Sequence, residues 1–139
     1  MRKEFSEQQH KQDDRPAKVA VRDYLVQNWG VWVSEGETYG VDLVCHRDGK
    51  MVGYVEVERR HNWVDEFPFP TVHVPARKGK FFILDLPTVL FSVRSDLKQA
   101  LWCPGEIIKD SPIQLLDNKH CEQEDFYVVP LDYWTLTDL

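Results

Sequence analysis

The sequence is poor in cysteine, in long apolar runs and in excess positive charge. Its three cysteines, Cys45, Cys103 and Cys121, are odd in number and far apart, so neither a disulfide framework nor a paired-cysteine zinc motif is indicated. No stretch approaches the roughly 18 apolar residues of a membrane span, and the N-terminal residues lack an apolar signal region. We therefore expect a soluble, cytoplasmic protein with no membrane partner and small buried thiols.

The net charge of −6 argues against indiscriminate binding to nucleic acid, which draws on an excess of Lys and Arg. The acidity is uneven, because residues 1–103 hold 15 acids and 15 bases, whereas residues 104–139 hold eight acids and two bases. We expect a neutral body with an acidic C-terminal flank that steers a polyanion. A Gly-rich phosphate loop and a nucleophile elbow are both missing from the sequence, which argues against a small-molecule enzyme.

A predicted β-hairpin over residues 39–63 carries the candidate chemistry. Two apolar runs, 41–45 and 52–57, flank the turn sequence RDGK at 47–50. In the second run Glu56 and Glu58 alternate with valines, so both carboxylates face one side of the strand. A hairpin closed at this turn pairs Asp42 near position 55 or 56, which brings three carboxyl groups within reach of one another.

Three converging carboxylates repel one another unless a divalent cation or a shared proton relieves them. Oxygen ligands of this kind suit Mg²⁺ or Mn²⁺. The alternative is that Glu56 and Glu58 form the solvated face of an amphipathic edge strand. Asp42 favours the metal hypothesis, because a strand such as VDLV disfavours an Asp without a function.

The hairpin pattern resembles the PD-(D/E)xK nuclease superfamily, which includes restriction enzymes, junction resolvases and small phage nucleases. Residues 39–43 (YGVDL) place an acid in a strand after a glycine, and residues 55–58 (VEVE) place acid-x-acid in the next strand. Thirteen residues separate Asp42 from Glu56, which is within the range of that family. Two positions depart from the pattern: Val41 stands where Pro is usual, and Glu58 stands where Lys is usual, as in E-x-E members.

The resemblance implies an α/β fold, with one mixed β-sheet flanked by helices in an αβββαβ restriction-endonuclease-like core. It implies that Asp42, Glu56 and the carbonyl of Val57 hold Mg²⁺ or Mn²⁺, and that Glu58 orients the attacking water or acts as its general base. It also implies a homodimer, DNA as the favoured substrate and a phage-type source.

Two groups of basic and polar residues follow the second strand and are candidates for contacting phosphates. They are Arg59, Arg60 and His61, then Arg77, Lys78 and Lys80. Because Glu58 occupies the usual lysine position, we expect Lys78 to reach back and supply the missing positive charge. The alternative for each of these residues is a solvated loop or strand end. For Trp63 the candidate role is stacking on a base or sugar, and the alternative is packing in the core.

The remaining pattern predicts a single domain over 13–139 after a flexible N-terminus at 1–12. Helical spacing of apolar residues predicts a helix over 15–28, and Ser95-Asp96 predicts the cap of a second helix through Leu101. Asp14 and Asp23 are the acids that the first helix has available for the metal site, although each fits a cap or a solvated charge better. Strands are predicted at 31–33, 71–74, 89–93, 107–108, 115–116 and 126–129, and Tyr133-Trp134 are predicted to anchor the end of the chain.

The sequence therefore favours a metal-dependent endonuclease that hydrolyses phosphodiester bonds in nucleic acid. A second hypothesis is a catalytically silent, nuclease-fold accessory protein of a phage or mobile element, which binds a protein partner through a Trp-rich surface. The net acidity and the missing lysine favour this alternative, and a fold does not guarantee chemistry.

Overall fold

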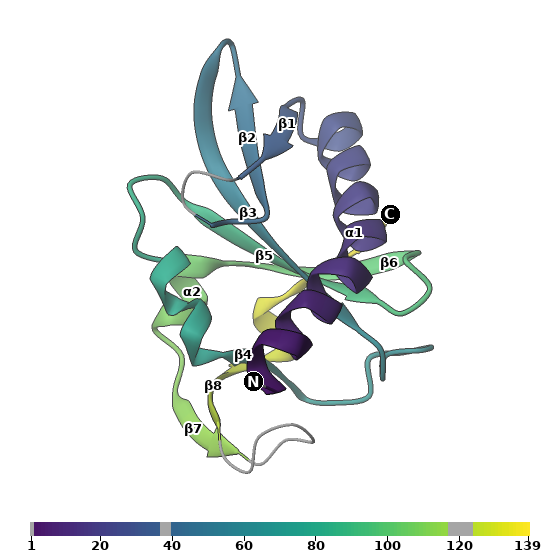
Figure 1. The fold of residues 1–139 in the computed structure, drawn as a ribbon, viewed down its shortest axis with the longest axis vertical. Helices are drawn as coiled ribbons and strands as arrows, with labels where there is room; N and C mark the ends of the chain where they lie inside the picture. The colour runs from purple at the N-terminus through teal and green to yellow at the C-terminus, as the bar shows by residue number, and fades with distance from the viewer. Residues whose placement is uncertain (1, 37–39, 117–123) are drawn as a thin grey trace.

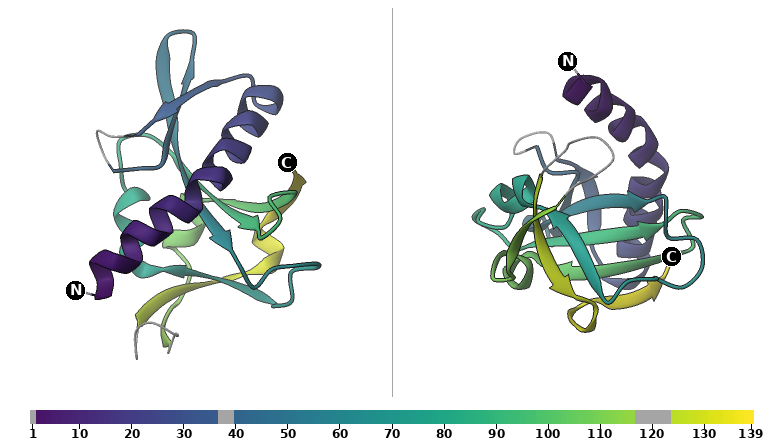
Figure 2. Two further views of the ribbon diagram at one scale, coloured as in Figure 1. Left: turned by 45° about the vertical axis from the view of Figure 1, so that its right-hand side comes forward. Right: turned by 90° about the horizontal axis from the view of Figure 1, so that it is seen from below.

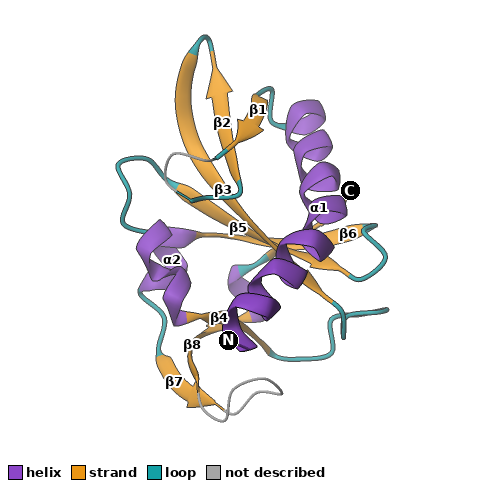
Figure 3. Cartoon of the chain, viewed as in Figure 1, coloured by secondary structure: helices purple, strands orange, loops and turns teal. Residues whose placement is uncertain are grey.

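A computed structural model describes residues 2–36, 40–116 and 124–139 of the chain, with side chains from residue 15 onward. The chain folds into helices and strands that Figure 3 colours by type. In chain order they are α1 (Arg2–Asn28), β1 (Trp32–Glu35), β2 (Leu43–Arg47), β3 (Lys50–Arg60), β4 (Thr71–Pro75), the 3₁₀ helix η1 (Ala76–Phe81), β5 (Thr88–Arg94), β6 (Gln99–Pro104), α2 (Gly105–Lys109), β7 (Ile113–Leu116), β8 (Glu124–Pro130), the 3₁₀ helix η2 (Leu131–Tyr133) and β9 (Thr135–Asp138).

A mixed six-stranded sheet forms the centre of the molecule (Figure 1). Its strand order is β1-β2-β3-β5-β6-β9, and β3 runs parallel to β5 while the other neighbours are antiparallel. Two parallel neighbours need a crossover connection. Residues 61–87 supply it with β4 and η1 and contain no α-helix. The observed architecture is a single α/β domain with a mixed sheet and few helices.

Helix α1 lies on one face of this sheet in all views (Figures 1 and 2). Ala17, Val21 and Leu25 recur every four residues, so they form one stripe on the helix, and all three are fully buried. They pack in a cluster with Val55 and Val57 of β3. This stripe fixes the last turns of α1 against the strand that carries the candidate site.

The opposite face of the sheet is covered by a second sheet of order β4-β8-β7 and by η1. Tyr54 of β3 lies in the core on this side, together with Trp63 and Val72. Both faces of β3 are therefore covered, and a strand covered on both faces buries successive residues rather than alternate ones. Glu56, which shares the face of Tyr54, is consequently placed in the interior.

The predicted hairpin is confirmed. Arg47 pairs with Lys50, and Asp48 and Gly49 between them both have positive φ, 53° and 76°. Two positive φ values are typical of the type I′ turn, whose twist matches that of the flanking strands, and Asp-Gly adopts this turn readily. Leu43 pairs with Val55, so Asp42 lies beside Glu56 as the spacing predicted. The strands predicted near 31–33, 71–74, 89–93, 115–116 and 126–129 are also present.

Three predicted elements are wrong. Helix α1 begins at Arg2 rather than near residue 15. Residues 95–101 form a turn and the start of β6 instead of a helix, because Leu97 takes φ 67° and Asp96 accepts the N–H of Lys98. Residues 107–108 belong to α2 instead of a strand.

Several smaller predictions concern buried residues. Cys45 and Cys103 are free, buried thiols, and Cys121 lies outside the described residues. Trp63 is buried in the core, with 1% of its surface exposed. At the end of the chain Trp134 is buried, whereas Tyr133 is mostly exposed, so only the tryptophan anchors this segment.

None of the described helices is long and apolar enough to cross a membrane.

Candidate functional site

The site is built on a pair of carboxylates, Asp42 and Glu56, at the point where β2 begins beside β3. Asp42 comes directly before β2, and Glu56 lies in the middle of β3. Each carboxylate binds the backbone of the other strand. Glu56 Oε2 accepts the N–H of Asp42 at 2.7 Å, and Asp42 Oδ2 accepts the N–H of Val57 at 2.8 Å. These reciprocal bonds continue the β2–β3 ladder with side-chain oxygens and fix both carboxyl groups.

The tight approach of β1 also helps to position Asp42. The N–H of Gly36 donates to the carbonyl of Asp42 at 3.3 Å. A Cβ on Gly36 would clash with the carbonyl oxygen and the side chain of Val41. Glycine at position 36 therefore lets β1 pack closely against the residue that leads into Asp42. Nothing in the sequence pattern pointed to this role.

A lysine contacts the second oxygen of each carboxylate, one from each side of the sheet. Lys78 of η1 donates to Glu56 Oε1 at 3.0 Å, and Lys18 of α1 lies 3.2 Å from Asp42 Oδ1. The side chains of Lys78 and Glu56 are 16% and 3% exposed, so their ion pair is largely removed from water. The Lys18 and Asp42 side chains are more accessible, at 26% and 18%. The predicted reach of Lys78 to the carboxylates is confirmed, whereas Lys18 was missed.

Burial raises the pKa of Glu56 from 4.5 to about 7, and the charge of Asp42 adds to this rise. The charge of Lys78 and hydrogen bonds from Lys78 and the Asp42 backbone oppose it. The carboxyl group of Glu56 therefore changes its charge near neutral pH. A buried, perturbed carboxyl beside specific charged partners is typical of a functional site.

Burial alone would lower the pKa of Lys78, but nearby carboxylates outweigh it and raise the pKa. The largest of these contributions comes from Glu58, followed by Glu56 and Asp42. Lys78 is thus the cation that all three predicted acids share. It remains charged at neutral pH, which supports the role expected from the missing lysine at position 58.

Glu58 lies on the same strand face but is held by a different partner. Its Oε2 accepts from Arg60 at 3.2 Å, and Arg60 also contacts Ser92 Oγ at 3.3 Å and donates to the carbonyl of His73 at 2.5 Å. Ser92 is fully buried. Arg60 therefore links Glu58 to β5 and β4 and fixes the orientation of its carboxylate.

The donor set suits a hard divalent ion. One oxygen of Asp42 and one of Glu56 are fixed by backbone N–H groups, while the other oxygen of each faces an ammonium group that a cation can replace. In a β-strand the N–H and C=O of one residue point to the same side. Because the N–H of Val57 points to Asp42, its carbonyl faces that side as well. In the part of the chain that the structure describes, no three His, Cys, Asp or Glu side chains form a metal-binding group. The three acids therefore do not form one metal-binding group: backbone hydrogen bonds link Asp42 and Glu56, whereas Glu58 pairs with Arg60.

Most predicted phosphate-contacting residues already have partners within the protein. Arg59 donates to the carbonyl of Ser95, and Arg77 lies 3.6 Å from Glu124. Lys80 lies 5.1 Å from the ring of Phe81. His61 is exposed at the end of β3. These residues are spread around the fold and do not form one basic surface, so their contact with nucleic acid stays a prediction.

Of the two acids that the first helix offered, Asp23 does not join the site. Asp23 is exposed and lies 3.7 Å from Arg22, and the side chain of Asp14 lies outside the described residues. The helix instead contributes the cation Lys18. Lys18 follows the buried Ala17 and so borders the buried stripe, but its contact with Asp42 depends on how α1 crosses the sheet, which the spacing does not reveal.

The tryptophans do not gather on one exposed surface. Trp63 and Trp134 are buried, and Trp29 and Trp102 are partly buried and pack against the core cluster beneath α1. Trp32, 55% exposed, stacks on His46 at a centroid distance of 3.9 Å.

Comparisons with protein-family models and with curated proteins find no match to this chain.

Proposed function

We propose that the protein is a metal-dependent endonuclease with an E-x-E variant of the PD-(D/E)xK site, and that DNA is its favoured substrate. The observation that carries the proposal is the buried Glu56, fixed beside Asp42 by reciprocal backbone bonds and paired with Lys78. Burying a carboxyl at such a cost in hydration is seldom retained without a function. The parallel β3–β5 pair, flanked by β2 and β6 and covered by α1, supports a restriction-endonuclease-like core.

Asp42 and Glu56, with the carbonyl of Val57, would hold Mg²⁺ or Mn²⁺, which would supply a water molecule of lowered pKa and polarisation of the phosphate. Lys78 stays positive and offsets the charge that develops on the phosphate. Glu58, oriented by Arg60, accepts the proton of the attacking water. Cutting both strands of a duplex takes two copies of the chain, as the resemblance implies.

The test is a cleavage assay on supercoiled plasmid, single strands and a four-way junction, with Mg²⁺, Mn²⁺ or EDTA. Wild type is compared with Glu56→Gln and with Glu106→Gln, an exposed carboxylate of α2 that serves as the matched control. We expect divalent-dependent cleavage in wild type and in the control, and only background cleavage in Glu56→Gln. Equal cleavage by all three preparations would reveal a contaminating nuclease and remove the support for this site.

The alternative, a silent binding protein, predicts no cleavage of any substrate and no binding of Mn²⁺ that depends on Asp42. The binding surface suggested for it is small in this structure, because two of the five tryptophans are buried, two are partly buried against the core, and only Trp32 is mostly exposed. Folded wild-type protein that neither cuts nor binds Mn²⁺ would favour it over the nuclease.

A further inference from the structure

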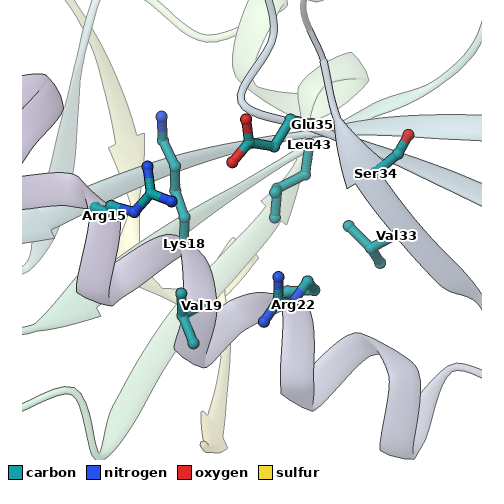
Figure 4. Close-up of a pocket in the computed structure, with 8 residues that line it drawn as sticks. All are labelled: Arg15, Lys18, Val19, Arg22, Val33, Ser34, Glu35 and Leu43. Carbon is teal, nitrogen blue, oxygen red and sulfur yellow. The ribbon is translucent and has the colours of Figure 1, made fainter.

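A basic groove lies between α1 and the edge of the sheet, next to the carboxylate pair. Its volume is about 250 Å³, and α1 forms one wall while β1 and the start of β2 form the other (Figure 4). Its lining residues are Arg15, Lys18, Val19, Arg22, Val33, Ser34, Glu35 and Leu43. None of the basic residues among them was a candidate in the sequence analysis.

Three cations line the helical wall because of their spacing. Arg15, Lys18 and Arg22 stand at i, i+3 and i+7, so they share one side of α1, directly beside the buried stripe. Glu35 is the one acid among the lining residues, which leaves three positive charges against one negative. The excess of +2 applies to the lining residues alone, because Asp42 pairs with Lys18 and Asp23 lies near Arg22 just outside the lining.

The two arginines of the groove are available to an external anion. Arg15 is exposed and has no ion pair with any carboxylate in the described part of the chain. Arg22 lies 3.7 Å from Asp23, but both side chains are about half exposed, and an exposed pair of this kind contributes little. In Figure 4 the Arg15 and Lys18 side chains extend from α1 toward the end of β1 that carries Glu35.

Lys18 connects the groove to the candidate site. Its ammonium lines the groove and lies 3.2 Å from Asp42 Oδ1, and Leu43 of the groove is the next residue after Asp42. An anion bound along α1 therefore ends beside the carboxylates. The volume is below the roughly 300–1,000 Å³ of pockets that enclose a small ligand, which suits one segment of a longer polyanion.

We propose that this groove binds the phosphate backbone of the nucleic acid strand and directs it to Asp42 and Glu56. The proposal deepens the proposed function and rests on it for the identity of the polyanion. Cations at one-turn spacing along a helix contact successive phosphates without reading bases, so the contact is independent of sequence. An acidic peptide is the other polyanion with matching charge, and the test below separates the two.

The test measures binding of a fluorescein-labelled 20-base-pair duplex and of its single strand by anisotropy in EDTA, where no cleavage occurs. Arg15→Ala/Arg22→Ala is compared with the matched control Lys98→Ala/Lys109→Ala, which removes the same charge from exposed positions outside the groove lining. Lys18 is left intact because it contacts Asp42. Unlabelled polyglutamate is added as a competitor in a separate series.

We expect the groove variant to lose affinity on the order of tenfold or more near 0.1 M salt, and the slope of log K against log[salt] to fall by about 2. The control variant should match wild type, and polyglutamate at equal charge should compete weakly. Equal affinity of the two double variants would overturn the proposal, as would complete displacement of both probes by polyglutamate.

Cleavage measured on the same variants separates this proposal from the proposed function. If wild type and the groove variant cut equally well in Mg²⁺ at concentrations below saturation, the groove proposal fails and the nuclease stands. If wild type binds through the groove and does not cut, the groove stands and the nuclease fails.

Discussion

Glu56 makes the free energy of unfolding depend on pH. Its pKa is about 7 in the folded chain against 4.5 for an exposed carboxyl, so the folded state holds a proton that the unfolded state has already released. Between these two pH values the free energy of unfolding falls as pH rises, by up to about 1.4 kcal/mol per unit. We expect Glu56→Gln to remove this part of the slope in urea unfolding measured from pH 5 to pH 8.

Glu106→Gln is the control for that experiment, since the side chain is exposed in α2. It should retain the wild-type slope. A wild-type slope of the same size in Glu56→Gln would mean that Glu56 is not the titrating group.

Lys78 controls the charge of Glu56. Its ammonium and its hydrogen bond both lower the pKa of that carboxyl, so Lys78→Ala should raise this pKa further, by on the order of one unit. The measurement is a pH titration of the Glu56 side-chain carbon by ¹³C NMR, assigned with Glu56→Gln. Lys80→Ala, from the same 3₁₀ helix but placed over the ring of Phe81, should leave the titration unchanged. A similar shift in both variants would indicate a general charge effect.

The sequence located the carboxylates and Lys78 because their signals are local or tied to a known pattern. Asp-Gly fixed the turn, and the turn fixed the register that pairs Asp42 with Glu56. The role of Lys18 could not be predicted, because it depends on how α1 crosses the sheet. The partners of Arg59 and Arg60 are carbonyls from other elements, which no spacing reveals.

At the scale of elements, α1 positions the cationic wall of the groove through its buried stripe. Leu25 is fully buried against the sheet, and truncating it leaves a cavity in that core cluster. We expect Leu25→Ala to lower the free energy of unfolding by about 2–5 kcal/mol in urea denaturation. Val26→Ala, at a neighbouring position that is 48% exposed, should cost less than about 1 kcal/mol. Equal costs would mean that α1 is not packed as described.

The helix predicted through Leu101 is wrong because of how β6 is buried. In β6, Ala100 and Leu101 are both buried because each face of the sheet is covered. A strand that is buried on both faces lacks the alternation of apolar and polar residues. Its sequence is therefore equally compatible with a buried helix. Turn chemistry at 95–98 decided the outcome, since Asp96 binds both Arg94 and the N–H of Lys98. Ser and Asp, which predict the N-terminal cap of a helix, are also common in hairpin turns.

For the whole molecule, the carboxylate pair joins the two layers that cover the sheet. Lys18 reaches it from α1 and Lys78 from η1, so a metal that replaces these ammonium groups binds the folded chain only. An ion at about 100 times its Kd stabilises the fold by about 2.7 kcal/mol, which raises Tm by several degrees. Because the Glu56 proton competes with the ion, we expect the Mn²⁺-dependent rise in Tm to be larger at pH 8 than at pH 6.

The variant for this measurement is Asp42→Asn, which keeps the shape of the side chain and removes its charge. It should show no Mn²⁺-dependent rise in Tm at either pH, whereas Asp110→Asn, an exposed residue at the end of α2, should behave as wild type. A rise that is equal at both pH values and survives Asp42→Asn would place metal binding elsewhere on the chain. It would also separate the carboxylate pair from the activity proposed for it, because ion pairs with Lys18 and Lys78 would then be its whole role.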